Sequence, residues 1–74
     1  MEQLDKKKAL KPEDAEMILT IADCNINLAQ VAQKLYVHRN TVSYRIERIR
    51  KQTGLDATKF YDLVKLVELV KAEN

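Results

Sequence analysis

The fold is decided by the stretch LAQVAQKLYVHRNTVSYRIE, residues 28–47. Apolar residues recur in it at helical spacing on both sides of Tyr36-Val37, which predicts two helices joined by a tight turn. Ala32 is small enough to let these helices cross closely. A short helix, a tight turn and a longer helix form a helix-turn-helix. The contacts between its parts are expected from Val31, Ala32, Leu35, Val37, Val42 and Ile46.

A further helix is predicted before this stretch. Pro12, followed by Glu13 and Asp14, is typical of a first helical turn, where acids favour the positive end of the helix dipole. The helical spacing continues to about residue 23. Its buried side is expected to carry Ala15, Ile18, Leu19 and Ala22.

The later helix boundaries also have sequence signals. Asn27, with Gln30 three places on, is typical of a helix N-cap, and Gly54 suits a left-handed C-terminal cap. A last helix is expected from about Thr58. Its helical stripe is Phe60, Leu63, Val64, Val67 and Val70, and it has Leu66 and Leu69 in addition. Its apolar residues exceed one face, so they either complete a core or include a stripe that contacts a partner.

These elements predict an all-α, four-helix domain with helices at about 12–23, 28–35, 39–53 and 58–72. A chain of 74 residues forms one domain at most. We expect residues 1–10 to be a flexible leader and 11–74 the helix-turn-helix domain. No apolar run approaches the roughly 18 residues of a membrane span, and the first residues lack the apolar core of a signal peptide. The expected location is cytoplasmic, without membrane contact.

Residues suited to catalysis or metal binding are scarce. Cys24 is the single cysteine, and its expected role is that of a small apolar residue at a helix end. His38 is the single histidine, and no nucleophile stands near it in a recognisable arrangement. Gly-rich phosphate loops are absent from the sequence. We therefore expect no enzymatic activity, no metal and no cofactor.

The positive charge is concentrated in the middle of the chain. Residues 27–51 contain six Lys and Arg side chains, among them all four arginines, against Glu47 alone, whereas residues 1–26 have four Lys against six acids. Arginine's planar fork suits phosphates and base edges better than the point charge of lysine. The charge distribution therefore favours nucleic acid as the partner.

Polar side chains occupy the start and the outward side of the second helix of the motif. The run from His38 to Thr41 can donate to and accept from base edges and phosphates. The rotation of 100° per residue places Ser43 and Tyr44 about opposite Val42 and Ile46. Arg45, Arg48 and Lys51 flank this edge. The alternative is that His38 or Asn40 only caps the helix and that the arginines form an ordinary solvated face.

At these residues the sequence resembles a known family. The segments LYVHRNTV (35–42), YRI (44–46) and TGLD (53–56) are similar to the C-terminal DNA-binding domain of PucR/CdaR-type bacterial regulators of purine catabolism and sugar diacids. The similarity extends in order over about residues 13–72. The same core looks more distantly like the Fis-type DNA-bending proteins. The resemblance implies a bacterial transcription regulator in which this module binds operator DNA and a larger N-terminal part senses an effector.

The resemblance also implies roles for particular residues. Base contact falls on His38, Arg39 and Asn40, to which the helical projection adds Ser43. Phosphate contact falls on Asn27, Gln30, Thr41, Tyr44 and Arg45, with Arg48 and Lys51 added from the flanking positions. One feature departs from the usual motif, since Tyr36 stands where a glycine commonly makes the turn. We expect a wider turn or a strained tyrosine that costs about 1 kcal/mol.

A single module of this size binds DNA weakly, so the expected active form is a homodimer on two half-sites. Its contact is expected from the fourth helix, through Leu66 and Leu69, or from the sensor domains. Two other functions remain open. One is a Fis-like DNA-bending nucleoid protein with looser sequence preference. The other is a helical protein-interaction module whose Arg-rich face meets an acidic partner.

Overall fold

The computed structural model describes residues 10–73, which form four α-helices. These are α2 (Pro12–Asp23), α3 (Leu28–Leu35), α4 (Arg39–Thr53) and α5 (Phe60–Glu73). The all-α fold and the bounds of the first three helices are as expected. The fourth helix begins later than Thr58, because the Asp56 side chain accepts hydrogen bonds from both N–H and Oγ1 of Thr58 and holds that segment in a turn.

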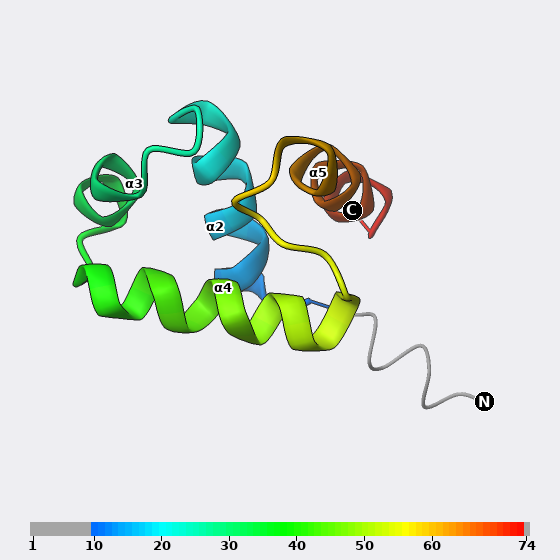
Figure 1. Cartoon of the computed structure of the whole chain (residues 1–74), viewed down its shortest axis with the longest axis horizontal. Coiled ribbons are helices and arrows are strands. Elements are labelled where there is room, and N and C mark those ends of the chain that lie inside the picture. The colour runs from blue at the N-terminus through cyan, green and yellow to red at the C-terminus, as the bar shows by residue number, and fades with distance from the viewer. Residues whose placement is uncertain (1–9, 74) are drawn as a thin grey trace.

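Helix α2 is the centre of the domain. It contacts α3, α4 and α5, and α3 also contacts α4. In Figure 1, α4 lies along one edge of the molecule, with α3 near its first residues and α5 on the opposite side of α2. The helix-turn-helix formed by α3 and α4 is therefore supported by α2, while α5 packs on α2 away from the motif.

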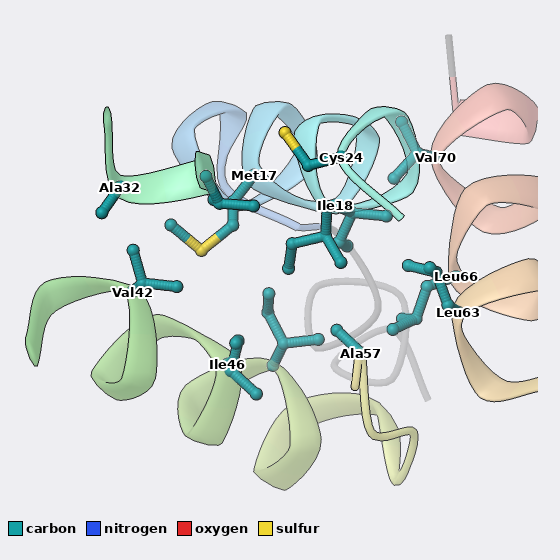
Figure 2. Close-up of a cluster of buried hydrophobic side chains, with 13 residues drawn as sticks. Met17, Ile18, Cys24, Ala32, Val42, Ile46, Ala57, Leu63, Leu66 and Val70 are labelled. Atoms are coloured by element: carbon teal, nitrogen blue, oxygen red, sulfur yellow. The ribbon is translucent and has the colours of Figure 1, made fainter. Parts of the chain in front are cut away.

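A single apolar core joins the helices. Figure 2 shows Val42 and Ile46 of α4 directed toward Met17 and Ile18 of α2, and Leu66 reaches the same core from α5. Its buried members are Met17, Ile18, Ile21, Cys24, Val31, Ala32, Val42, Ile46, Ile49, Ala57, Leu63, Leu66 and Val70. The expected contacts within the motif are confirmed, with Leu35 and Val37 half-buried against this cluster. Cys24 has the expected role at a helix end.

The expected buried side of α2 was partly wrong. Leu19 is exposed, and Ala15 and Ala22 are only half-buried, because the inner face is centred on Met17, Ile18 and Ile21. The three other helices surround α2 from several directions, so its buried stripe is set by their positions rather than by the most obvious apolar spacing. The same face buries the carboxylate residue Asp14, which we had placed at the helix dipole.

Helix α5 also differs from expectation. Leu66 was expected at an exposed edge, but it is fully buried against the core, and Leu69 is half-buried. Phe60 and Val64 belong to the helical stripe that could complete a core, yet Phe60 is 64% exposed and Val64 is exposed as well. The helix is rotated so that Leu63, Leu66 and Val70 face inward, and its surplus apolar residues lie on another side than the one predicted.

The turn of the motif is a Schellman motif with tyrosine at the left-handed position. Tyr36 has φ 57° and ψ 43°, and the N–H of Val37 donates to the Ala32 carbonyl at 3.0 Å. Of the two outcomes expected for Tyr36, the structure has the strained tyrosine in a tight turn. The expected caps at Asn27 and Gly54 are confirmed, since Asn27 accepts from the Gln30 N–H and Gly54 has φ 79°.

A similar turn ends α2. Asn25 and Ile26 both have positive φ, 55° and 63°, and the Ile26 N–H donates to the Ile21 carbonyl at 2.9 Å. A β-branched residue rarely adopts this conformation.

The folded domain includes the first described residue, Leu10. Leu10 packs against the core, so the folded part begins no later than this residue. The rest of the predicted leader lies outside the described residues. No helix among residues 10–73 combines the length and the apolar character that crossing a membrane requires.

Candidate nucleic-acid interface

Helix α4 is anchored on one side and exposed on the other. Val42, Ile46 and Ile49 hold it against the core. Its exposed residues are Arg39, Asn40, Ser43, Tyr44, Glu47, Arg50 and Lys51. Tyr44, near the middle of this surface, is 64% exposed. The outward surface that the sequence predicted is therefore present, and we call it the outer face of α4.

The start of α4 is capped by His38. Its Nδ1 accepts a hydrogen bond from the Asn40 N–H at 3.0 Å, so the proton of the neutral imidazole lies on Nε2. The capping role that we considered as an alternative is thus present. It does not use all of the ring, because His38 is exposed and its Nε2 remains a donor toward solvent. Asn40 takes part through its backbone, and its side chain is exposed.

The charges at the start of α4 favour an anion. No acid lies in the first turn, and the positive end of the helix dipole points there. Arg39 and Lys51 form no ion pair with any described residue. Arg50, by contrast, is paired with Glu47 on the same helix, and this pair raises the pKa of Arg50 and lowers that of Glu47. Arg39 and Lys51 are therefore the exposed cations of α4 that remain available to a partner.

Arg48 faces α2 rather than solvent. Its Nη2 lies 2.7 Å from Asp14 Oδ1 and 2.7 Å from Glu13 Oε2, and its Nε donates to Asp14 Oδ2 at 3.2 Å. These carboxylates raise the Arg48 pKa above its ordinary value, and Arg48 lowers the Glu13 pKa. The side chain of Arg48 is 25% exposed and that of Asp14 is not exposed at all. The guanidinium that we had assigned to phosphate contact is thus used within the domain.

Arg48 also positions a neighbour on the outer face. Its guanidinium carbon lies 5.6 Å from the centroid of the Tyr44 ring, within the range of a cation–π contact. Arg45 is half-buried on the same side of α4, where its charge also lowers the Glu13 pKa. The two acids of α2 therefore hold one edge of α4 and, through Arg48, the ring of Tyr44.

The remaining expected contact residues border α4. Asn27 and Gln30 are exposed at the start of α3, and Thr41 is half-buried in the first turn of α4. The structure thus places the candidates at the start of α3 and along the length of α4. Arg48 is the one whose charge is already satisfied by carboxylates. Within residues 10–72, no cluster of side chains could hold a metal ion.

Two residues of this region had no role in the sequence-based site. For Asp14 the sequence indicates only a favourable place near the positive end of the helix dipole. Nothing in the sequence connects it with Arg48, which lies far along the chain. Tyr36 was judged only as a misfit in the turn, although it is 94% exposed beside the start of α4. The signal available in the sequence was a tyrosine at the turn position where glycine is common.

The short helix α3, the tight turn and an α4 with a cationic, polar outer face define a helix-turn-helix domain of the DNA-binding type. Comparison with known families makes the assignment specific. Residues 15–71 match the model of the PucR C-terminal helix-turn-helix domain, and the chain belongs to this family of DNA-binding domains of transcription regulators.

Several curated bacterial proteins are similar to part of this chain. A "Leucine-rich protein" of Streptococcus dysgalactiae subsp. equisimilis is 43% identical over 37 residues, 50% of this chain and 13% of that protein. An uncharacterized protein of Mycobacterium tuberculosis is 42% identical over 48 residues, 65% of this chain and 12% of that protein. The carbohydrate diacid regulator of Escherichia coli is 42% identical over 38 residues, 51% of this chain and 10% of that protein.

The chain therefore spans only 10–13% of the length of these three relatives. No solved structure matches it.

Proposed function

We propose that this domain binds duplex DNA sequence-specifically, as the DNA-binding part of a bacterial transcription regulator. The observation that carries the proposal is the outer face of α4, which begins at a dipole-favoured helix end with Arg39 exposed and without a carboxylate partner. In this arrangement α4 lies in the major groove and its first turns read base edges. The domain acts by binding, without chemistry or cofactor.

The side chains divide into two groups by their place on the motif. Base contact belongs to the start and outer face of α4, with Arg39 suited to O6 and N7 of guanine and Asn40 to N6 and N7 of adenine. Phosphate contact belongs to the flanks. The base-reading group is His38, Arg39, Asn40 and Ser43, and the phosphate group is Asn27, Gln30, Thr41, Tyr44, Arg45 and Lys51. Arg48 is excluded from the second group because Asp14 and Glu13 occupy its donors.

Selection of bound fragments from random duplex DNA, followed by titration at several salt concentrations, tests this function. Arg45 and Lys51 are the two cations of the phosphate group, so each bound domain should show a slope of log affinity against log salt of about −2. A selected duplex should bind more than about tenfold tighter than a random one. Equal binding to all duplexes would favour a Fis-like protein. Loss of all duplex binding near physiological salt would favour a protein-interaction module.

The regulator to which this domain belongs is expected to have a further part that senses an effector. The carbohydrate diacid regulator among the relatives is the observation in favour of such an organisation, since its matched segment is 10% of its length. We infer that this larger part of the regulator controls the binding of the domain to its operator DNA.

The active form is proposed to be a dimer that uses α5. A groove of about 380 Å³ runs between the end of α2 and α5. Its apolar lining is Ala22, Ile26, Phe60, Leu63, Val64 and Val67. None of the proposed DNA-contact residues lines it, so the groove and the outer face of α4 can be occupied together. Phe60 and Val64 replace Leu66 and Leu69 as the candidate dimer contact, because they are exposed apolar residues of this helix that line the groove.

Replacing Phe60 by serine should reduce cooperative binding to a duplex with two half-sites about tenfold, because the variant loses an exposed aromatic side chain at the dimer contact. Binding to a single half-site should be unchanged. The measurement is a gel-shift titration of both duplexes. Leu19→Ser is the control, since Leu19 is also an exposed large apolar residue but does not line the groove. Equal cooperativity in Phe60→Ser and the wild type would exclude this contact.

A further inference from the structure

Tyr36 is an energetically unfavourable residue at its position in the turn. It is 94% exposed, and it has φ 57° at the place in a Schellman motif where glycine is favoured. Among the described residues its hydroxyl makes no hydrogen bond. The turn therefore bears both backbone strain and an exposed aromatic ring, and no contact with another described residue compensates for either.

The surroundings of Tyr36 connect it with the proposed base-reading residues. A hollow of about 580 Å³ lies beside it, between α3 and the start of α4. Its other lining residues are Ala29, Ala32, Gln33, Val37, His38 and Arg39. Two of them, His38 and Arg39, belong to the proposed base-reading group. A strand that borders the groove occupied by these residues would pass along the hollow, with its phosphates near the tyrosine hydroxyl.

We propose that the Tyr36 hydroxyl donates a hydrogen bond to a backbone phosphate of the bound DNA, with the strand seated in this hollow. The inference rests on the proposed function and adds a contact that neither the charge pattern nor the family resemblance assigned. Most hydrogen bonds from proteins to DNA go to phosphate oxygens, and tyrosine is among their donors. The left-handed turn directs the Tyr36 side chain away from the domain and toward the bound DNA. This contact accounts for a strained backbone at this position.

Two variants separate this contact from the fold. Tyr36→Phe removes only the hydroxyl and should weaken binding to the selected duplex about tenfold, as expected for a lost hydrogen bond to a charged acceptor. Tyr36→Gly should weaken binding at least as much, while its thermal unfolding midpoint stays equal to that of the wild type or rises, because glycine relieves the strain. Since a hydroxyl releases no counterion, the salt slope should stay unchanged in both variants.

Tyr61→Phe is the matched control, because Tyr61 is exposed on α5, away from the hollow, and its variant should bind like the wild type. If the wild type binds the duplex and Tyr36→Phe binds it as tightly, this inference is overturned and the proposed function stands. A reduced salt slope in Tyr36→Phe would also overturn it, because the contact would then depend on charge. If the wild type binds no duplex, the proposed function fails and this inference fails with it.

Discussion

Replacing Arg48 by methionine should destabilise the domain by about 3 kcal/mol, because the change leaves the carboxylate of Asp14 buried without its partner. Asp14 is fully buried, and its two oxygens accept from Nη2 and Nε of Arg48 at 2.7 and 3.2 Å. For a domain of this size, such a loss lowers the thermal unfolding midpoint by about 12–24 °C. Calorimetry or thermal circular dichroism measures it directly.

Two comparisons show whether the buried carboxylate is the cause. Arg50→Met removes an arginine of the same helix whose pair with Glu47 is exposed, and its unfolding midpoint should hardly change. The double variant Asp14→Leu/Arg48→Met replaces the pair by apolar side chains and should recover much of the lost stability. If Arg48→Met and Arg50→Met have equal midpoints, the ion pair does not hold α4 on α2.

Glu13 gives this ion-pair cluster a pH dependence of known sign. Its hydrogen bond with Arg48 lowers its pKa below the ordinary value of 4.5. The stabilisation is therefore complete above pH 4.5 and is lost as the pH falls through the lower pKa of the folded state. In Glu13→Gln the pH-dependent contribution of this carboxylate is absent. The free energy of unfolding of this variant should therefore decline less steeply below pH 4.5.

Removal of the Arg39 side chain should cause the largest loss of DNA binding. Arg39→Ala should weaken the selected duplex by about 1–3 kcal/mol, or roughly 5- to 150-fold, and relax the preference at one base position. The reason is that Arg39 is exposed at the start of α4 and has no carboxylate partner among the described residues, so its two-pronged donor is available to a guanine. Fluorescence anisotropy with duplexes substituted at each position measures both effects.

The matched comparison is Lys51→Ala, on the same outer face but near the end of α4. It should weaken all duplexes alike and reduce the magnitude of the salt slope by about 1, as expected for a phosphate contact. Arg48 is unsuitable for this comparison, because its loss would change the fold through Asp14. If Arg39→Ala also weakened every duplex equally, Arg39 would contact phosphate and the base-reading group would lose its main member.

Local features of the sequence predicted most of the fold. Pro12, Asn27 and Gly54 marked helix boundaries correctly, because caps depend on backbone conformation within a few residues. The packing of Val42 and Ile46 against α3 was also predictable, since helical spacing alone separates the inner side of α4 from its outer face. For the same reason the exposed residues of the candidate site could be named before the structure.

The rotation of α2 and α5 was not predictable from spacing. Each carries more apolar residues than one neighbour can cover, so the choice between Leu66 and Phe60 as the buried residue depends on where the other helices lie. The sequence also offered no reason to connect Asp14 with Arg48. That contact depends on the crossing of α2 and α4, and it converts an expected phosphate ligand into part of the scaffold.

The sequence by itself determined the helix-turn-helix, its polarity and the charge of its outer face, because these follow from interactions between residues close in the chain. Only the tertiary structure decided which cations remain available to DNA, which side of α5 stays exposed, and that Tyr36 projects beside a hollow at the start of α4. These properties depend on how helices that are distant in the sequence pack against one another. The same packing places the buried carboxylate of Asp14 beside Arg48.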